Sequence, residues 1–566
     1  MSAAAAPTSP APGAPAAPRH PWLWRLVELA GVFALAVARP DLELAADTPE
    51  FFTVRDASDA AIVVFAIALI AAVPLLLLGL EALADRLRSG LGERVHGVLL
   101  AVLLGALAVP FLVRLTDGAG ITGWLLLAAA LAIGVAATVA ARRWVPTRSF
   151  LRALGFAPPI VLALFLADAP LGGANATDGL RVARPAPIVV VIFDEFPAAS
   201  LYDRDGTVSR TRMPTFARLA REGTLWADAT SPADTTPHAV PSLLGGAPPR
   251  IGRTPNLDTW PRNLFTLLRG QYDISALEPV TNLCPRETCP DDQTGGITTL
   301  FGDAGRLALR AIAPPDLRTH LPPVIGEEGT LTDPDAQIDT FLGRLTDGDR
   351  PSLRMLHVLL PHHPWTHLAD GEEYALPNDR ADKLPEGYED RRWTEDAAVV
   401  ARNRRRHLAQ VSYADRVLGK IVARLERTGR YDDTLLVVAA DHGVSFRPGG
   451  AVRDATRRNA GEIVSVPLLM KRPGQRRGGV VTGQAELTHV LPTILDVLGA
   501  PAADRRGSLL SPRPADADLA VASSAGGATT LRLRLSEIRR QREAVIATQP
   551  EPWTKADTAA ASRSGP

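Results

Sequence analysis

The chain has 566 residues, which is too long for one compact core and predicts two or three folding units. Its 61 Lys and Arg residues balance its 61 Asp and Glu residues, so no net field attracts nucleic acid, and we expect no nucleic-acid partner. Hydrophobic residues make up 46% of the chain and are concentrated in the first third, which predicts a membrane domain followed by a soluble domain.

The amino-terminal third contains apolar stretches of the length that crosses a bilayer. Residues 1–20 are rich in Ala and Pro and are expected to form a disordered tail. Residues 21–168 are predicted to form about five transmembrane helices, because a helix needs about 20 residues to cross hydrocarbon. The predicted segments are 22–38, 60–80, 97–113, 121–141 and 150–167. The first contains Arg25 and Glu28 and ends in small residues, so a cleaved signal peptide is an alternative for it.

The charges of the connecting loops predict the orientation. Residues 39–59 carry six acidic residues against two arginines, whereas residues 81–95 and 142–152 are rich in arginine. Short cytoplasmic loops are enriched in Lys and Arg. We therefore expect a multi-pass plasma-membrane protein with its amino terminus inside and its large carboxy-terminal part outside. Cleavage of the first segment leaves four passes and the same external location.

The remainder of the chain has the pattern of an α/β domain. After a linker over 169–185, short apolar runs alternate with amphipathic helical patterns, which predicts a mostly parallel sheet within a domain over 186–510. The predicted strands are 187–193, 353–360 and 434–440, and the predicted helices include 213–222, 403–429 and 488–499. These strands lack polar alternation, so we expect helices on both faces of the sheet.

Each predicted strand is followed at once by side chains that can perform chemistry. They are Asp194 and Glu195 after the first strand, His362 and His363 after the second, and Asp441 and His442 after the third. Ligands bind past the carboxyl ends of strands in open α/β sheets, so we expect these groups to converge. Two adjacent buried carboxylates would raise each other's pKa, and a divalent cation would instead stabilise their anionic forms. The pattern therefore predicts a metal site.

A stretch rich in Thr, Ser and Pro, ATSPADTTPHAVPSLLGG, lies between the first two strands and is predicted to enter a helix near residue 240. A hydroxyl group at a helix amino terminus and beside a metal is favoured as an alkoxide nucleophile by the helix dipole and by coordination. Thr235 and Thr236 are the candidates. The alternative is that one of them only caps the helix.

Seven segments, in this order, resemble the alkaline phosphatase and sulfatase superfamily, in particular its membrane branch of lipoteichoic acid synthases and phosphoethanolamine transferases. The segments are VVVIFDEFP, TTPHAVPSLLGG, LHVLLPHHPW, VSYADRVLGKIVARL, VVAADHGVSF, VPLLMKRPGQ and PTILDVLG. The resemblance spans about 185–500 and implies an alkaline-phosphatase-like α/β/α domain after the transmembrane bundle. It also implies one divalent metal ion held by Asp194, Thr236, Asp441 and His442, with Glu195 as a further candidate ligand. Carboxylate and imidazole ligands suit Zn, Mn or Fe better than an all-oxygen shell, but they leave Mn, Zn, Mg and Ca open.

The resemblance also favours one of the two threonines. The transferase relatives place the nucleophile a few residues before a Val-Pro step, here Val240 and Pro241, and this favours Thr236. The alternative register aligns Thr235 with the sulfatase cysteine, but the Ser and Arg of the sulfatase pattern are then missing. Threonine cannot be converted to formylglycine, so sulfate ester hydrolysis is disfavoured.

The implied function is metal-dependent cleavage of phosphate or sulfate esters. We expect Thr236 to attack and His362 to protonate the leaving oxygen, with transfer of a phosphoryl-linked lipid head group to an envelope glycan or lipid acceptor. One alternative is a phosphodiesterase or sulfuric ester hydrolase of envelope glycans. The other is a catalytically inactive membrane scaffold. The substrate and the oligomeric state are left open.

Two further features complete the chain. Cys284 and Cys289 are its only cysteines, and their spacing favours a disulfide over two free thiols in an oxidising compartment. Residues 511–566 are predicted to be a tail that is partly helical or disordered. Its basic stretch, residues 531–546, could pack on the domain or lie on anionic lipid, but an exposed helix is favoured.

Overall fold

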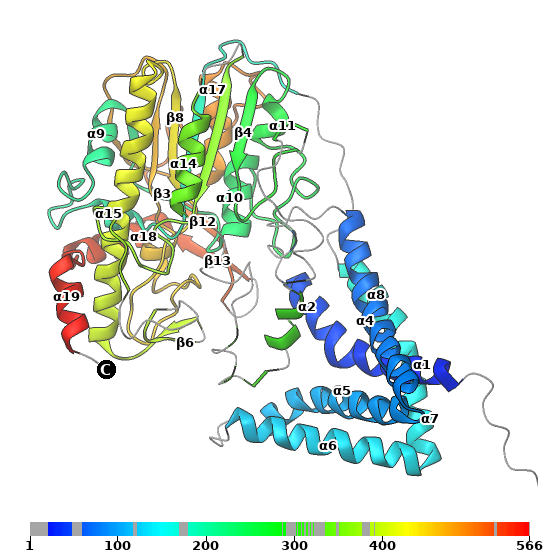
Figure 1. Ribbon diagram of the computed structural model, residues 1–566. Helices are drawn as coiled ribbons and strands as arrows, with labels where there is room; N and C mark the ends of the chain where they lie inside the picture. Colours follow the sequence, from blue (N-terminus) through cyan, green and yellow to red (C-terminus); the bar gives the residue numbers. More distant parts are fainter. Residues whose placement is uncertain are drawn as a thin grey trace, which may run out of the picture. The chain divides into compact units, whose positions relative to one another are not determined.

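The computed structural model describes residues 21–47, 52, 59–116, 122–168, 179–285, 287–289, 334–346, 350–375, 385–389, 391–525 and 529–564, with short pieces between 302 and 321. They form two compact units, one made mainly of the amino-terminal helices and one that contains the α/β domain (Figure 1). The predicted disordered tail, residues 1–20, and most of the predicted linker, residues 169–178, lie outside the described residues.

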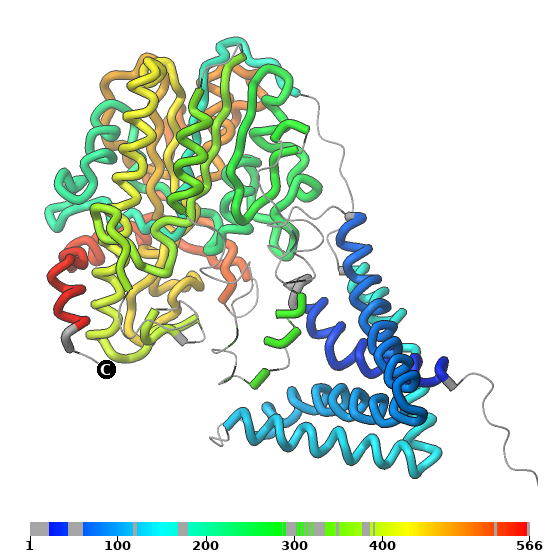
Figure 2. Tube along the Cα trace, in the orientation of Figure 1, coloured from blue at the N-terminus to red at the C-terminus, as the bar shows by residue number. Residues whose placement is uncertain are grey.

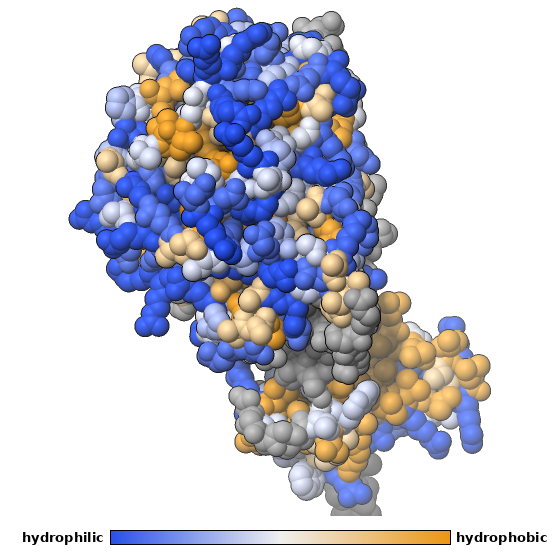
Figure 3. Space-filling view, turned by 90° about the vertical axis from the view of Figure 1, so that its left-hand side faces the viewer, coloured by the Kyte–Doolittle hydropathy of each residue, from blue (hydrophilic) through white to orange (hydrophobic). Residues whose placement is uncertain are grey.

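The amino-terminal unit is helical. Its elements are α1 (Pro21–Phe33), a π-helical turn (Ala34–Ala38), α2 (Arg39–Asp47), α4 (Asp59–Leu87), α5 (Leu91–Leu115), α6 (Gly123–Arg143), α7 (Val145–Ala153) and α8 (Ala157–Asp168). Large hydrophobic side chains such as Leu76, Phe111 and Trp124 are exposed on it. Its surface is correspondingly hydrophobic, whereas that of the α/β unit is mostly hydrophilic (Figure 3).

Four segments of the described chain are long and apolar enough to cross a membrane, rather than the five predicted. They are Ala60–Leu87, Leu91–Leu115, Gly123–Arg143 and Val145–Ala167. The first predicted segment, residues 22–38, is not among them. Glu28 and Arg39 bound an apolar run that is shorter than the about 20 residues a spanning helix needs. The four helices are compatible with a membrane anchor.

Glu28, the charge that interrupts the first apolar segment, is buried and paired within the helical unit. Its carboxylate lies 3.3 Å from His96 Nε2 and accepts a hydrogen bond from Arg152 Nε at 3.1 Å. His96 Nδ1 lies 2.8 Å from Glu81, and Arg25 forms an ion pair with the same Glu81. The network joins α1, α4, α5 and α7, so charges that look isolated in the sequence compensate one another.

A seven-stranded sheet forms the centre of the α/β unit, counted over the described residues, with the order β10-β2-β9-β8-β1-β5-β4. The strands are β1 (Ile188–Phe193), β2 (Thr224–Trp226), β4 (Asp273–Leu277), β5 (Ser352–Val358), β8 (Leu435–Ala440), β9 (Leu468–Lys471) and β10 (Gly479–Val481). All neighbouring pairs are parallel except those that β9 makes. All six residues of β1 are buried, as expected for a β-branched run covered on both faces. The predicted fold class is therefore confirmed, with four apolar helices instead of five.

The register of the sheet brings three strand ends together. Phe193, the last residue of β1, pairs with Val358 of β5 on one side and with Ala440 of β8 on the other. The residues that follow these strands therefore leave the sheet at the same edge. The sheet thus places segments far apart in the sequence beside one another at this edge.

Helices cover both faces of the sheet. On one face α9 (Pro214–Glu222), α14 (Pro334–Arg344) and α15 (Ala397–Arg427) pack together, and α10 (Thr236–Gly245) and α17 (Val490–Val497) pack on the other (Figure 1). Helix α15 begins six residues before the predicted helix, because the Asp396 carboxylate accepts hydrogen bonds from Ala398 N and Val399 N and caps it there. Cys284 and Cys289 form a disulfide, as predicted.

The carboxy-terminal region is folded onto the α/β unit. It forms an antiparallel pair, β12 (Asp518–Ser523) and β13 (Thr529–Arg534), followed by α18 (Leu535–Ala547) and α19 (Lys555–Ser564) (Figures 1 and 2). Helix α18 buries Leu535, Ile538 and Ile546. The favoured interpretation of residues 531–546 as an exposed helix is therefore wrong. Residues 531–534 belong to β13, and only the part from Leu535 onward forms the packed helix of the alternative. Local sequence could not show this, because the surfaces that α18 covers are formed by distant residues.

A buried ion pair fastens α18 to the sheet, and its removal is expected to destabilise the unit. Asp228, between β2 and β3 (Ala229–Thr230), is 1% exposed and accepts hydrogen bonds from Arg539 Nη2 at 2.7 Å and Arg542 Nη2 at 3.2 Å. Burial opposes its ionisation, but bonds from Arg539 and Gly483 N outweigh burial and lower the pKa of Asp228. We expect Asp228→Asn to lower the free energy of unfolding by about 3 kcal/mol at neutral pH.

The pH dependence of this loss has a definite sign. Because the folded-state pKa of Asp228 is depressed, its contribution is present above the pKa of the unfolded chain and is lost as the pH falls through the folded-state pKa. Chemical unfolding should therefore show that the free energies of unfolding of the wild type and of Asp228→Asn become more similar as the pH is lowered. Asp518→Asn, at an exposed pair with Arg534, is the matched control and should change stability by less than about 1 kcal/mol. Equal losses in both variants would contradict the assignment.

Candidate active site

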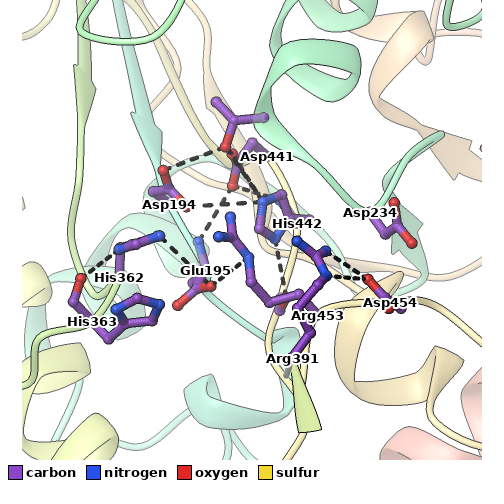
Figure 4. A network of polar contacts seen from close by, with 12 residues as sticks. Asp194, Glu195, Asp234, His362, His363, Arg391, Asp441, His442, Arg453 and Asp454 are labelled. Atoms are coloured by element: carbon purple, nitrogen blue, oxygen red, sulfur yellow. Dashed lines mark hydrogen bonds and ion pairs between the residues drawn. The ribbon is translucent and has the colours of Figure 1, made fainter. Parts of the chain in front are cut away.

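Two carboxylates and an imidazole converge at the common edge of β1 and β8. Asp194 follows β1 directly, and Asp441 and His442 follow β8. One ligand atom from each of the three lies within 4.8 Å of the others, and all three residues are buried. Figure 4 shows the three side chains pointing toward one another. The sheet therefore gathers three of the four predicted metal ligands.

Thr236, the fourth predicted ligand, reaches this group from the first residue of α10. Its hydroxyl donates to Asp441 Oδ2 at 2.6 Å and lies 3.4 Å from both Asp194 Oδ2 and His442 Nε2. Thr235 is the helix N-cap residue, but its hydroxyl lies 2.8 Å from His238 Nδ1 and makes no capping bond to the helix. The structure thus separates the two threonines, because only the Thr236 hydroxyl lies among the Asp and His side chains.

The electrostatics of this cluster favour a cation. Burial, reinforced by the charge of Asp441, raises the pKa of the Asp194 carboxyl well above its ordinary value. Burial likewise raises the pKa of Asp441 to about 7, and burial followed by the charge on Arg453 lowers the pKa of His442. Without a bound cation, the surroundings therefore disfavour the anionic forms of Asp194 and Asp441. A divalent cation would reverse this, because it compensates both charges at once.

The residues present fit a divalent metal ion. Asp194 Oδ1 is buried and has no hydrogen-bond partner within the part of the chain that the structure describes. His442 Nδ1 lies 3.0 Å from Gly443 O, to which it donates as N–H, and this tautomer leaves the Nε2 lone pair facing the carboxylates. Two carboxylates, one neutral imidazole and one hydroxyl form a donor set that divalent ions accept. These four residues would hold the ion.

Glu195 lies in a second group, beside the first. It adopts a left-handed backbone conformation with φ of 58°, which is uncommon for a residue other than glycine. Its carboxylate lies with His362 and His363, each offering a ligand atom within 4.8 Å of the others, and Oε1 lies 2.9 Å from Arg453 Nε (Figure 4). Burial opposes ionisation, but the charges of His362 and Arg453 lower the pKa of Glu195 to about 2. The turn at Glu195 therefore gives two adjacent acids different partners.

His362, the predicted proton donor, belongs to this second group. It is buried in the segment that follows β5, and its Nε2 lies 3.8 Å from Glu195 Oε1. Its Nδ1 lies 2.5 Å from the carbonyl oxygen of His363, to which it donates. The Nε2 atom is therefore the ring nitrogen that faces Glu195.

Sequence reasoning missed three residues at this edge. His357, inside β5, is buried with its Nε2 3.7 Å from Asp194 Oδ2, and burial lowers its pKa to about 3. His407 of α15 donates from Nε2 to the backbone oxygen of Glu195 at 3.0 Å, which supports the left-handed turn. Arg453 comes from an irregular turn. The only sequence signal was the presence of a histidine in a buried strand and in a buried helix face.

Two further basic residues of the α/β unit have partners other than the four residues proposed to hold the ion. Arg447 Nε donates to Glu462 at 3.0 Å. Lys471 is fully buried and donates from Nζ to the backbone oxygen of Tyr431 at 2.9 Å, and its strand partner Leu436 lies near the start of β8. Lys471 is therefore at the end of β8 opposite to Asp441. Arg453, by contrast, lies beside the candidate site, with its Nε 2.9 Å from Glu195 Oε1.

Arg453 is expected to matter for stability through Glu195. Arg453→Met leaves a fully buried carboxylate without its nearest cation, and we expect a loss of about 3 kcal/mol in the free energy of unfolding. Chemical unfolding measures the change. The double variant Arg453→Met, Glu195→Gln should recover part of the loss, because it removes the uncompensated charge. A double variant with the summed loss of both single variants would contradict this pairing.

Comparison with known proteins identifies the family. The Sulfatase family model matches residues 187–500, which is more than half of the chain. The multifunctional alkaline phosphatase superfamily protein PehA of Trinickia caryophylli is 33% identical over 108 residues, 19% of this chain and 21% of the relative. The choline-sulfatase of Rhizobium meliloti is 35% identical over 101 residues, 18% of this chain and 19% of the relative. The chain thus spans about a fifth of the length of these curated relatives.

Solved structures give matches of lower identity. A phosphonate monoester hydrolase from Silicibacter pomeroyi matches with a TM-score of 0.41 and 19% identity, over 60% of this chain and 80% of the other. The carboxy-terminal periplasmic domain of EcEptC from Escherichia coli, solved in complex with Zn, matches with a TM-score of 0.40 and 13% identity, over 63% of this chain and 96% of the other. On the match of the family model to residues 187–500, the chain belongs to the sulfatase family within the alkaline phosphatase superfamily.

Proposed function

We propose that this protein is a metal-dependent phosphoryl transferase of the sulfatase family that uses Thr236 as its nucleophile. The observation that carries the proposal is the position of the Thr236 hydroxyl, 2.6 Å from Asp441 Oδ2 and 3.4 Å from His442 Nε2 at the start of a helix. A divalent ion bound by Asp194, Thr236, Asp441 and His442 would supply Lewis acidity and lower the pKa of the Thr236 hydroxyl.

In the first half-reaction, side chains of the protein supply the attacking oxygen, the group that accepts its proton and the group that protonates the leaving oxygen. The Thr236 proton leaves along its hydrogen bond to Asp441 Oδ2 and passes on to solvent, so Asp441 returns to its anionic form. Thr236 Oγ1 forms a bond to phosphorus while the bond from phosphorus to the leaving oxygen breaks. His362 Nε2 gives a proton to that oxygen, so the leaving group departs as a neutral alcohol. The product is a phosphorylated Thr236.

The second half-reaction reverses these roles. A hydroxyl of the acceptor gives its proton to His362 Nε2 and attacks phosphorus, and the bond to Thr236 Oγ1 breaks. A proton from solvent returns to Thr236 Oγ1 by way of Asp441 Oδ2. The chemistry requires a hydroxyl nucleophile and no oxidant or reductant. Water in place of the acceptor makes the same site a hydrolase.

The donor in this proposal is a lipid with a phosphoryl-linked head group, and the acceptor is an envelope glycan or lipid. The four apolar helices support anchoring of the domain to a bilayer, and such tethering raises the local concentration of lipid donors relative to soluble esters. The loop charges support an extracytoplasmic position for the domain. Threonine in place of a formylglycine precursor supports phosphate over sulfate. Hydrolysis of envelope phosphodiesters or sulfate esters is the second candidate, supported by the curated relative named as a sulfatase.

A head-group-labelled lipid assay separates the two candidates. The full chain is incubated with a phospholipid that carries a radioactive phosphoryl head group, with and without an envelope glycan fraction. Label that moves to the glycan, and that stays on the lipid without acceptor, supports transfer. Label released into water at equal rates under both conditions overturns transfer in favour of hydrolysis. If the label stays on the lipid under every condition, both transfer and hydrolysis of this donor are overturned, and the inactive scaffold is supported.

A further inference from the structure

A third cluster of metal-ligating side chains lies apart from the two groups of the candidate active site. Asp335, His367 and Glu373 each offer a ligand atom within 4.8 Å of the others. Asp335 is the second residue of α14, and the other two come from the turn over residues 366–374 that follows the active-site histidines. No step of the proposed reaction uses any of the three.

His367 is held in one orientation. The backbone N–H groups of Thr366 and His367 both donate to Gln410 Oε1, at 3.0 and 3.2 Å. The imidazole stacks on the Tyr413 ring with the planes 3° apart and the centroids separated by 4.9 Å. Its Nδ1 lies 3.3 Å from Thr366 Oγ1. These contacts fix the ring with Nε2 facing the two carboxylates.

His367 Nε2 has no hydrogen-bond partner within the described chain, although the residue is 5% exposed. It lies 3.9 Å from Asp335 Oδ2 and 3.6 Å from Glu373 Oε1, and both distances are too long for a hydrogen bond. An unsatisfied buried nitrogen costs about 1–3 kcal/mol. An ion placed between the three groups would remove this cost.

The two carboxylates are also positioned by their surroundings. The Tyr413 hydroxyl donates to Asp335 Oδ1, which leaves Oδ2 on the side of His367. His367 and Glu373 pair across an antiparallel bridge, and the bond from Tyr374 N to Thr366 O at 2.7 Å closes the turn around them. Outer contacts of this kind orient the ligands of metal sites.

We propose that Asp335, His367 and Glu373 form a second, separate site for a divalent transition-metal ion such as Zn²⁺. Zinc binds imidazole nitrogen and carboxylate oxygen, and open zinc sites combine three protein ligands with a water molecule. Bonds of about 2.1 Å at tetrahedral angles place ligand atoms about 3.4 Å apart. The two separations from His367 Nε2, 3.6 and 3.9 Å, approach this value, and all three ligand atoms lie within 4.8 Å of one another, so the ligands have to draw together to hold the ion.

The Glu373 side chain is 73% exposed and that of Asp335 is 42% exposed, so an ion reaches the site from solvent. The bound ion links the start of α14 to the turn over 366–374, which rests on Tyr413 and Gln410 of α15. Because ion binding requires the folded arrangement of the three ligands, its binding free energy adds to the stability of this part of the domain.

Zinc stoichiometry tests the site. Tag-free full-length protein in detergent is stripped with chelator, titrated with Zn²⁺ by calorimetry, and its bound zinc is counted by mass spectrometry. We expect His367→Ala to bind one equivalent less than the wild type, and Glu373→Gln to weaken binding of that equivalent by about tenfold or more. Glu372→Gln is the matched control, because the neighbouring Glu372 carboxylate pairs with Lys555 instead.

The active-site ion is distinguished from this one by an Asp441→Asn background, in which His367→Ala should still bind one zinc equivalent less. Zn²⁺ should raise the midpoint of thermal unfolding more for the wild type and Glu372→Gln than for Glu373→Gln, which keeps the side-chain shape. Equal zinc binding by wild type, His367→Ala and Glu373→Gln overturns the proposal. The proposal is also overturned if Glu372→Gln loses as much zinc binding as Glu373→Gln, because such a result indicates nonspecific binding to surface carboxylates.

Discussion

Thr236→Ala is expected to lower turnover by at least about 10³-fold, which corresponds to about 4 kcal/mol of activation free energy. The reason is that this substitution removes the hydroxyl that lies 2.6 Å from Asp441 and leaves the helix and the sheet unchanged. Alanine is well tolerated at the first turn of a helix, so the fold should persist. Hydrolysis of aryl phosphodiesters, phosphonates and sulfates, together with the lipid assay, measures the loss.

Two controls make the result specific. Thr235→Ala removes the adjacent hydroxyl, which contacts His238 instead of the acidic cluster, and should change turnover by less than about tenfold. Thr236→Ser keeps an attacking oxygen and should retain far more activity than Thr236→Ala. A Thr235→Ala protein that is as inactive as Thr236→Ala, or a Thr236→Ala protein with normal turnover, would contradict the assignment of the nucleophile.

Asp441→Asn is expected to abolish both metal binding and turnover. Asp441 lies among the donor atoms of Asp194, Thr236 and His442, and the asparagine has nearly the same shape but no charge. The remaining charge no longer matches a divalent ion, so we expect turnover to fall by about 10³-fold or more. Chelator should inactivate the wild type, and added Mn²⁺ or Zn²⁺ should restore it. The Asp441→Asn protein should not recover at the same metal concentrations.

Asp432→Asn serves as the control for a general effect of charge. Its carboxylate is 49% exposed and pairs with Arg476 on the surface, so metal content and turnover should stay at wild-type levels. Thermal unfolding of the metal-free forms checks that Asp441→Asn is folded. Full activity of chelated wild-type protein, with its metal content shown to be nil, would contradict a metal-dependent reaction.

The strand ends of the fold were predictable because they depend on local pattern. Ile188–Phe193 and Leu435–Ala440 are continuous apolar runs, and such runs form buried parallel strands whose carboxyl ends meet at one edge. The convergence of Asp194 with Asp441 and His442 follows from that rule. The choice of Thr236 over Thr235 did not follow from pattern, and it rested on the resemblance to the transferases.

Other features depend on contacts that no local pattern records. Glu195 takes a left-handed conformation that a sequence gives little reason to expect of glutamate, and its partner Arg453 comes from an irregular turn. Asp228 and Arg542 are 314 positions apart, so the folded carboxy-terminal region could not be inferred from its basic composition. The first predicted segment is not among the four helices that could cross a membrane, because Glu28 interrupts it and Arg39 follows it, which leaves a short apolar run.

The central claim is that Thr236 forms a covalent bond to the transferred group. Intact-mass measurement of purified full-length protein after exposure to a phospholipid donor, followed by peptide mapping, tests it most directly. We predict a mass increase that matches the phosphoryl head group, located on Thr236, discharged by an acceptor and missing in Thr236→Ala. An adduct that persists in Thr236→Ala, or turnover of the donor with no adduct on any rapid-quench time scale, would contradict the account.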